Sequence, residues 1–389
     1  MTDLVYGQAQ PIMRDPILPR WWQSVDRWTM ASVFFLFGLG IILAFAASPP
    51  LAERNELHQF HYAQWHMNYG VVAMRVMLFT SVLSVNAIRR WASIGFAFAF
   101  AAIMLLPLFG VDHGKGAVRW FSIMGISLQP SELLKPVFVV FSAWLISAKF
   151  IVTAPPGPRI SFVLTAVVAF LLAMQPDFGQ AMLVLFAWGV MIFVAGTPLL
   201  PILALGGATA LAGLVAYNKS EHFARRIDGF LTADVDPTTQ LGIAARAIGE
   251  GGVFGAGAGE GSVKWDLPDA HTDFIIAVAA EEYGLVIIIP ILVLFSIIVL
   301  RSFMRLMHEK DMFVRLAGTG LVTIFGAQAL INMGVAVRLL PAKGMTLPFI
   351  SYGGSSLVAS GLTIGMILAL TKSRPQGTLV QAFRGSYSK

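Results

Sequence analysis

The stretch WTMASVFFLFGLGIILAFAAS, residues 28–48, holds 21 consecutive positions without a charged side chain. A helix of about 20 apolar residues spans the hydrocarbon core of a bilayer, which is roughly 30 Å thick. Backbone polar groups inside lipid must be hydrogen-bonded within the protein, which leaves helices or closed barrels as spanning structures. Barrel strands alternate apolar and polar residues, and this stretch does not. It therefore predicts a membrane-spanning helix.

Further apolar runs follow along the chain, so we expect an all-α, polytopic membrane protein with about ten transmembrane helices. The runs at 160–175 and 178–196 are separated only by Gln175, Pro176 and Asp177, and one bent segment is the alternative there. The expected spans are 28–48, 68–88, 91–111, 130–150, 160–175, 178–196, 199–217, 272–300, 314–336 and 352–371.

The composition agrees with a chain that lipid covers. Of its 389 residues, 57% are hydrophobic and 12% are charged, and the mean hydropathy is +0.74. A soluble domain is closer to ~25% charged, because its surface faces water. No gap between the runs is large enough for a soluble domain, so residues 28–371 are interpreted as one membrane domain between the tails 1–27 and 372–389. The absence of cysteine excludes disulfides and thiolate metal sites.

Lysine and arginine in the short loops predict the orientation, because cytoplasmic loops carry an excess of both. The first apolar run is interpreted as an uncleaved signal anchor. With a cytoplasmic N-terminus, fifteen basic residues fall inside: Arg14, Arg20, Arg27, Arg89, Arg90, Lys149, Arg159, Arg301, Arg305, Lys310, Arg315, Lys372, Arg374, Arg384 and Lys389. Five fall in the short outside loops: Arg54, Lys115, Arg119, Arg338 and Lys343. Both tails are then cytoplasmic, and the net charge of +6 reflects topology rather than nucleic-acid binding.

This orientation places three loops outside, at 112–129, 218–271 and 337–351. The longest carries a glycine run from Gly249 to Gly261. The run lacks the GK[ST] ending of a phosphate-binding loop and the GxGxxG spacing of a dinucleotide site. It forms either a mobile or tightly turned loop, or a backbone surface that admits a bulky ligand. Neither HExxH nor GxSxG occurs in the chain, so the zinc protease and serine hydrolase classes lack support.

Ionisable residues beside or inside the apolar runs remain as site candidates, because such residues usually face a protein interior or a water-filled cavity. Glu132 and Lys135 stand three apart and share a helix face. They form either an internal ion pair that fixes helix packing or a cationic pocket at the outer face, together with Arg119. Asp177, between two spans, is either a helix cap or a contact to a metal or substrate.

Two further segments lie near the outside face. In LPDAHTDF, residues 267–274, a carboxylate either caps the following helix or acts as a proton acceptor. In KGMTLPFISYGGSS, residues 343–356, the small residues allow either close helix packing or backbone donors for an anion. Gln328 and Asn332, in the preceding span, are expected to form hydrogen bonds between helices.

These segments, in this order, resemble the signature of the SEDS family, the shape, elongation, division and sporulation proteins. The phrase KGMTLP before FISYGGSS, and the LPDAHTDF form, are more similar to the division branch than to the elongation branch. Asp269 stands where the family usually has glutamate, and AEEYG replaces the commoner GEELG. The matching stretches are GAVRWFSIMGISLQPSELLKP (116–136), QPDFGQ (175–180), LPDAHTDFIIAVAAEEYG (267–284) and KGMTLPFISYGGSS (343–356).

The resemblance implies a peptidoglycan glycosyltransferase that polymerises lipid II at the outer face of the bacterial cytoplasmic membrane, at the division septum. The implied partners are lipid II, the nascent glycan, a class B penicillin-binding protein of the FtsI type and other membrane proteins of the divisome. The family's proposed catalytic aspartate, in the HTDF motif, falls on Asp273. A lipid II flippase and a non-catalytic divisome scaffold are the alternative functions.

This chemistry requires one base and positive charge, because the leaving diphosphate is stable without a general acid. Asp273 is the candidate base. A divalent cation, Mg²⁺ or Mn²⁺, could add to the positive charge, with Asp177 and Asp273 as candidate ligands. The candidate substrate-binding residues are Arg119, Trp120, Glu132, Lys135, Arg246, His271, Lys343 and Ser351.

Overall fold

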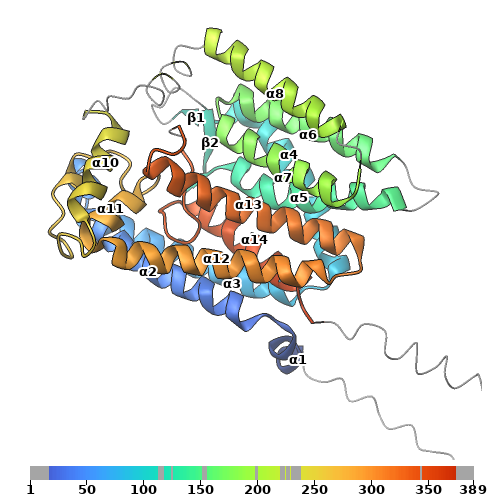
Figure 1. Cartoon of the computed structure of the whole chain (residues 1–389), viewed down its shortest axis with the longest axis horizontal. Helices are drawn as coiled ribbons and strands as arrows, with labels where there is room; N and C mark the ends of the chain where they lie inside the picture. The colour runs from blue at the N-terminus through green and yellow to red at the C-terminus, as the bar shows by residue number, and fades with distance from the viewer. Residues whose placement is uncertain are drawn as a thin grey trace, which may run out of the picture.

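The computed structural model describes residues 17–112, 118–123, 126–150, 156–197, 200–219, 224, 228, 238–341 and 344–373. Ten helices of 17 to 28 residues make up most of this part and pack in one bundle (Figure 1). They are α2 (Arg27–Arg54), α3 (His61–Val82), α4 (Val85–Phe109), α5 (Pro130–Ser147), α6 (Gly157–Met174), α7 (Phe178–Val194), α8 (Leu200–Lys219), α12 (Leu285–Met307), α13 (Met312–Ala336) and α14 (Gly354–Leu370).

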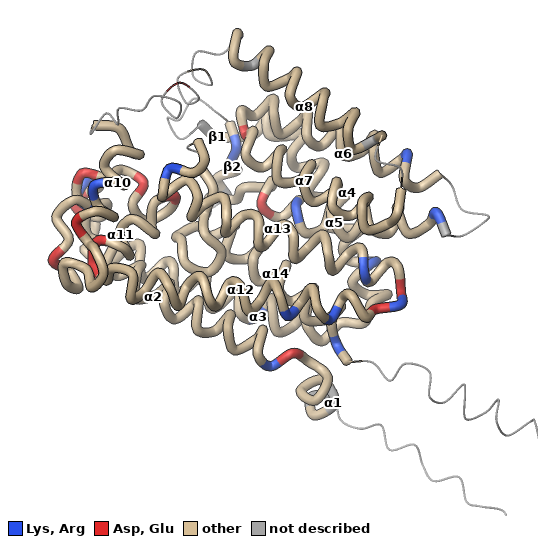
Figure 2. Tube along the Cα trace, in the orientation of Figure 1, with Lys and Arg blue, Asp and Glu red and all other residues tan. Residues whose placement is uncertain are grey.

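Seven of these helices are long and apolar enough to cross a membrane. The shorter α7 and α14 are also apolar, and at about 1.5 Å per residue their 17 residues still cover about 26 Å. α3 has 22 residues and a more polar first half. Charged residues lie mostly toward the two ends of the bundle (Figure 2). The prediction of an all-α, polytopic membrane protein is therefore confirmed.

The break between α3 and α4 lies earlier than the sequence predicts. α3 ends at Val82 and α4 begins at Val85, so the expected spans 68–88 and 91–111 both begin too late. Ser84 caps α4, since its Oγ accepts a hydrogen bond from the N–H of Ala87 at 3.3 Å. Arg89 and Arg90 consequently lie within α4 rather than in a loop.

The expected span 272–300 is divided at Gly284. The short helix α11 (Ile275–Tyr283) ends there, and α12 begins at Leu285 and continues to Met307. Gly284 has a φ of +63°, which glycine adopts without strain. A Cβ at this position would lie 2.3 Å from the carbonyl oxygen of Val253, so the chain of the long loop passes directly against the break. The runs at 160–175 and 178–196 form two helices, α6 and α7, rather than one bent segment.

One end of the bundle, named the loop end, carries the smaller elements (Figure 1). Its strands pair antiparallel in the order β1-β2-β3, with Val111 opposite Trp120 and Phe121 opposite Leu128. The long loop contributes two helical elements that the sequence did not predict, α10 and η2. The loop end comprises β1 (Val111–Asp112), β2 (Val118–Ile123), β3 (Ile126–Leu128), α10 (Gln240–Gly251), the 3-10 helix η2 (Val263–Trp265), α11 and segment 344–353.

The opposite end, named the tail end, carries the first and last described residues. Here α1 (Ile17–Ser24) meets the end of α14, and the N–H of Ser373 donates to the carbonyl of Ser24 at 3.0 Å. Trp22 and Trp28 are 46% and 65% exposed at this end. Exposed tryptophans typically mark a membrane–water interface. Both described ends therefore lie at the same end of the bundle, as the prediction of about ten spans with both tails on one side requires.

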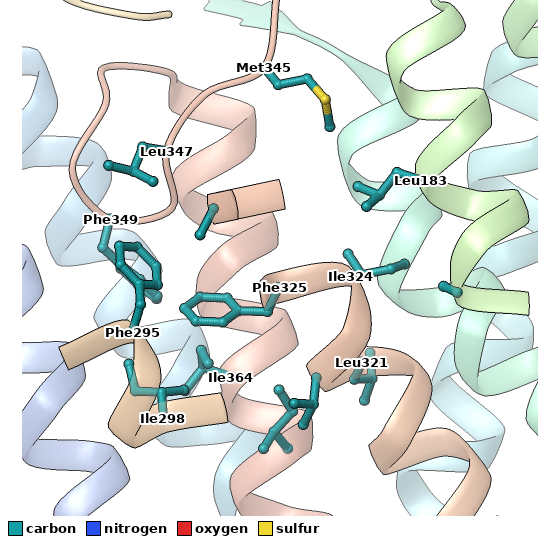
Figure 3. Close-up of a cluster of buried hydrophobic side chains, with 14 of the residues drawn as sticks. Leu183, Phe295, Ile298, Leu321, Ile324, Phe325, Met345, Leu347, Phe349 and Ile364 are labelled. Carbon is teal, nitrogen blue, oxygen red and sulfur yellow. The ribbon is translucent and has the colours of Figure 1, made fainter. Parts of the chain in front are cut away.

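Segment 344–353 is buried in the bundle instead of covering it (Figure 3). Leu347 and Phe349 are 1% and 0% exposed, and they extend between helices α12, α13 and α14. The ring of Phe349 lies 6.3 Å from that of Phe325, which lies 5.5 Å from that of Phe295. The segment therefore contributes to the hydrophobic core, and its path is fixed by packing.

The close approach of α2 to this segment generates a first prediction. A Cβ at Gly40 would lie 2.3 Å from the carbonyl oxygen of Phe349, whereas one at Gly38 would meet nothing within 4 Å. Gly40→Ala should therefore lower the melting temperature of the purified protein, because the segment must move, at a cost of about 1–3 kcal/mol. Gly38→Ala, on the same helix, should be neutral or slightly stabilising. Equal melting temperatures for the two variants would contradict this packing.

Candidate active site

Hydrogen bonds bring the four sequence motifs together at the loop end. The N–H of Gln129 donates to Ser355 Oγ at 3.0 Å, which joins the first motif to the fourth. The N–H of Tyr352 donates to the carbonyl of His271 at 2.9 Å, which joins the fourth to the third. Gln129 Nε2 also donates to Asp177 Oδ2 at 3.4 Å, so the second motif is adjacent as well.

Asp273 lies in the turn that precedes α11, and its side chain is half-buried. Asn332 of α13 holds this turn, because its Nδ2 donates to the carbonyl of Asp273 at 3.0 Å and to that of Met345 at 2.6 Å. A Cβ added to Gly344 would lie 3.2 Å from Asp273 Oδ2. The carboxylate therefore faces segment 344–353. Asp273 also remains partly accessible to solvent, and a general base must be accessible to reach a substrate.

Aromatic rings surround His271, two residues before Asp273. The His271 ring centroid lies 5.4 Å from that of Tyr62 on α3 and 5.6 Å from that of Tyr352. The two tyrosine rings meet edge to face at 5.5 Å. Such packing restricts how each ring is oriented. His271 thus lies beside the Asp273 turn, and its contact with substrate stays a prediction.

Ser351 supports the same turn from inside the protein. Its side chain is 2% exposed, and its Oγ donates to the carbonyl of Thr272 at 2.6 Å. The same oxygen accepts a hydrogen bond from the N–H of Leu347 at 2.9 Å. Because the hydroxyl already acts as both donor and acceptor within the protein, we interpret Ser351 as a residue that positions the Asp273 turn. Its predicted substrate contact is untested.

Glu132 and Lys135 form a buried ion pair on α5, with 3.0 Å between Lys135 Nζ and Glu132 Oε2. Gln180 of α7 donates to Glu132 Oε1 at 2.6 Å, and Lys135 donates to Gln328 Oε1 of α13 at 2.8 Å. Gln328 Nε2 in turn donates to the carbonyl of Thr346 at 2.9 Å. The network joins α5, α7 and α13 to segment 344–353. This arrangement fits the interpretation of Glu132 and Lys135 as an internal ion pair that fixes helix packing.

The cavity beside this network is small. It has a volume of about 10 Å³, which is room for about one water molecule. The Lys135 side chain is 2% exposed. Contact of Glu132 or Lys135 with a substrate therefore stays a prediction that requires the bundle to open.

Arg119 reaches from β2 to the connection between α6 and α7. Its Nε donates to the carbonyl of Gln175 at 2.9 Å, and its Nη2 donates to that of Pro176 at 2.8 Å. Trp120, the next residue of β2, is half-buried. Both residues lie at the loop end, but none of the described contacts joins Arg119 to Asp273. Their substrate-binding roles stay predictions.

Asp177 stands directly before α7, at the position of a helix cap, and is 6% exposed. Burial raises the pKa of Asp177 to about 6. Nearby Glu132 adds to the rise, while Arg119 and Lys135 oppose it. Asp177 is therefore an internal carboxylate that can take up a proton under mildly acidic conditions.

The remaining two predicted substrate-binding residues are Arg246 and Lys343. Arg246 lies on the exposed side of α10, where its Nη2 is 2.8 Å from Asp266 Oδ2 and its Nε is 3.9 Å from Glu250 Oε1. Exposed pairs of this kind contribute little to stability. None of the described contacts joins Arg246 to Asp273, and its binding role is untested. Lys343 lies outside the described residues.

A second buried cluster at the loop end was not predicted. Lys264, 3% exposed, pairs through its Nζ with Glu282 Oε1 and donates to the carbonyl of Ala46 at 3.2 Å. Glu281 accepts hydrogen bonds from the N–H groups of Val263 at 2.6 Å and Lys264 at 2.9 Å. In the sequence, only Glu281 and Glu282 inside an apolar run indicate this cluster. Their partner Lys264 lies in the long loop, so no local pattern predicts the pairing.

The glycine run forms tight turns against this cluster. A Cβ at Gly251 would lie 1.8 Å from the carbonyl oxygen of Ala280, and one at Gly255 would lie 2.2 Å from that of Glu282. Gly255 also has a φ of +80°. Of the two interpretations of the run, the tightly turned loop fits the described structure, because its backbone packs against α11.

The two predicted cation ligands, Asp177 and Asp273, have different neighbours at the loop end. Among the described residues, no group of three His, Asp or Glu side chains has the spacing of a metal site. Asp177 lies beside Gln129 and Glu132, whereas Asp273 lies beside Gly344. No described contact joins the two aspartates. A cation held by both aspartates stays a prediction, and one carboxylate can suffice for Mg²⁺ when phosphate oxygens complete its shell.

The buried Glu132–Lys135 pair generates a second prediction. Removing one partner of a buried ion pair costs about 3–5 kcal/mol, because the other charge stays buried alone. Lys135→Met should thus lower the melting temperature strongly, and adding Glu132→Gln to it should recover part of the loss. Melting curves of the two single variants and the double variant test this. Strictly additive losses would show that the two side chains are not coupled.

Comparisons with known proteins agree with this arrangement. The chain is 43% identical over 357 residues to the "Probable peptidoglycan glycosyltransferase FtsW" of Caulobacter vibrioides, which covers 91% of each chain. It is 34% identical over 347 residues to the protein of the same name from Trichlorobacter lovleyi, covering 87% of this chain and 91% of that protein.

Two solved structures share the fold. One, from a work on the "structural coordination of polymerization and crosslinking by a peptidoglycan synthase complex", has a TM-score of 0.73 and 26% identity, covering 95% of this chain and all of that chain. The rod shape determining protein RodA of Thermus thermophilus has a TM-score of 0.67 and 24% identity, covering 92% of this chain and 99% of that one. The profile of the FtsW/RodA/SpoVE cell cycle proteins matches residues 27–376, and the chain belongs to this family.

Proposed function

We propose that this protein is a peptidoglycan glycosyltransferase that polymerises lipid II into glycan strands during cell division. Family membership and the names of its relatives support this activity. The observation that carries the proposal is the placement of Asp273, half-buried at the loop end and held by Asn332. A carboxylate fixed in this way can serve as the base that glycosyl transfer requires.

The reaction transfers a sugar from a lipid diphosphate to the hydroxyl of another sugar. Asp273 takes the proton of the acceptor hydroxyl, whose oxygen forms a bond to the anomeric carbon of the donor. The bond from that carbon to the diphosphate oxygen breaks, and the diphosphate leaves with the electron pair. Positive charge near the leaving group stabilises it. Arg119 at the loop end and Lys343, three residues before Thr346, are the candidates from this chain.

The loop end faces outward in this proposal, and both chain termini are cytoplasmic. The excess of basic residues at the tail end, in the loops and in the helix turns beside them, supports this orientation. The exposed tryptophans of that end agree with an interface there. The outer face of the bacterial cytoplasmic membrane at the septum is then the place of action.

A class B penicillin-binding protein of the FtsI type is the proposed partner, because the glycan made here needs cross-linking. The likeness to the structure of a peptidoglycan synthase complex supports such an assembly. Other membrane proteins of the divisome belong to the same proposal.

A lipid II flippase is the main alternative. A transporter holds its substrate near the bilayer midplane and opens alternately to each side. In the described part of the chain, the motifs converge at one end, and the cavity beside the buried Lys135 has only about 10 Å³. These features favour catalysis at one face. Lipid II supplied on the outer side alone distinguishes the two functions, since only a polymerase makes glycan from it.

The assignment of the base predicts the effect of Asp273→Asn. Loss of a general base typically costs ~100-fold or more in rate. The variant should therefore make no detectable glycan from purified lipid II in the presence of its partner, while its melting temperature stays within a few degrees of wild type. Asp266→Asn is the matched control, because that aspartate is exposed and pairs only at the surface with Arg246. Normal glycan products from Asp273→Asn would refute the assignment.

A divalent cation is a further part of the proposal. Mg²⁺ is usually bound by one or two carboxylates together with substrate phosphates. When bound, Mg²⁺ or Mn²⁺ would supply positive charge to the leaving diphosphate, with Asp273 as its protein ligand. EDTA should then stop polymerisation by the purified protein, and added Mg²⁺ or Mn²⁺ should restore it. Unchanged glycan synthesis in EDTA would remove the cation from the proposal and leave Asp273 as base.

A further inference from the structure

The tail end of the bundle contains a cavity that the proposed function does not use. It has a volume of about 610 Å³ and lies where α12 and α14 end. Ligand pockets typically measure roughly 300–1,000 Å³. Its lining includes the basic side chains of Arg301, Arg305, His308 and Lys372. The acidic lining residue Glu309 is turned toward the backbone, since its Oε1 accepts hydrogen bonds from the next two N–H groups at 3.0 and 3.2 Å.

A buried carboxylate holds the two guanidinium groups of this cavity in place. Asp26, 2% exposed, accepts hydrogen bonds from Arg301 Nε at 3.1 Å and Nη2 at 3.0 Å, and lies 3.5 Å from Arg305 Nη2. Arg305 Nη1 donates to the carbonyl of Thr371 at 3.0 Å. The arginine side chains stay 35% and 30% exposed. A guanidinium has five N–H donors, so both groups retain donors for a ligand.

The charge around the cavity is positive. Asp26 balances one of the two guanidinium groups. Lys372, at the end of α14, adds an ammonium group that also donates to the carbonyl of Leu83 at 3.4 Å. Figure 2 shows several Lys and Arg positions close together at this end of the bundle. Arginine and lysine together are the usual partners of a phosphate group.

The cavity continues into an apolar stripe on the outer side of α12. Met304 lines the cavity and is 54% exposed. Val293, Leu300 and Met307 are 50%, 60% and 77% exposed, and their spacing places all four side chains on one helix face. Because α12 is long and apolar enough to span the membrane, this stripe faces lipid. A ligand with an anionic head and an apolar tail would match both parts.

We propose that this cavity binds the headgroup of an anionic phospholipid, with the acyl chains along the α12 stripe. The phosphate would contact Arg301, Arg305 and Lys372, and His308 would lie beside the glycerol part. Basic pockets between spanning helices on the cytoplasmic side are a known way of holding such headgroups. The site lies at the end opposite to Asp273, so it goes beyond the proposed polymerase activity.

Free inorganic phosphate shares the charge of the headgroup but not its tail. It would engage the same basic side chains and leave the α12 stripe unused. The apolar stripe therefore favours the lipid, and comparison of the two ligands distinguishes them.

The test titrates the full-length protein in uncharged detergent with a short-chain phosphatidylglycerol, with phosphatidylcholine of the same chain length, and with inorganic phosphate. Native mass spectrometry counts the bound ligand. We expect phosphatidylglycerol to bind at least tenfold more tightly than phosphatidylcholine, and phosphate to give no saturable binding in the same range. Equal affinity for both lipids, or equally tight binding of phosphate alone, would overturn the proposal.

Variants locate the site without disturbing Asp26. Lys372→Gln removes one charge, and His308→Glu introduces a negative charge into the lining, while neither residue contacts Asp26 in the described structure. The double variant should bind phosphatidylglycerol at least tenfold more weakly with an unchanged melting temperature. Arg90→Gln, an exposed arginine in α4 at the same end but outside the lining, should change binding less than twofold. Unchanged binding in the double variant, or an equal loss in Arg90→Gln, would place the lipid elsewhere.

Discussion

Asn332 provides the interaction on which the geometry of the loop end depends. Its amide group donates both to the carbonyl of Asp273 and to that of Met345. Segment 344–353 passes through the interior of the bundle, where an unpaired backbone carbonyl costs free energy. One buried side chain thus satisfies two carbonyls that lie far apart in the sequence, and it fixes the turn of Asp273 relative to this segment.

Buried charges extend this principle to the rest of the bundle. The network of Lys135, Glu132 and Gln328 joins α5, α7 and α13 to segment 344–353, and Lys264 joins η2 to α11 and α2. Each lysine meets a glutamate and a further acceptor, as buried ions require. Such pairs are weak evidence for net stability, since desolvation offsets much of the attraction. Their effect is to specify one arrangement of the helices at the end where the candidate base lies.

The sequence predicts the helices well because an apolar run of sufficient length has few alternatives in lipid. It misplaces the break at Leu83–Ser84, because the residues around this break carry no charge, whereas the charged Arg89 and Arg90 further on indicate a loop. The break at Gly284 follows from the approach of Val253, which no local pattern reveals. The sequence identifies the motif residues as site candidates by their chemical type. Which of them are accessible depends on tertiary packing, which the sequence pattern does not show. Ser351 and Lys135 are buried, whereas Asp273 remains half-open.

The two ends of the bundle therefore have different chemistry, with a carboxylate site at the loop end and a basic cavity at the tail end. The account depends on the loop end facing outward. The chain contains no cysteine, so single cysteines can be placed and labelled cleanly. Glu260→Cys, exposed at the loop end, should react with a membrane-impermeant maleimide in intact spheroplasts, whereas Lys310→Cys, exposed at the tail end, should react only after permeabilisation. The reverse labelling pattern would place Asp273 in the cytoplasm and contradict the account.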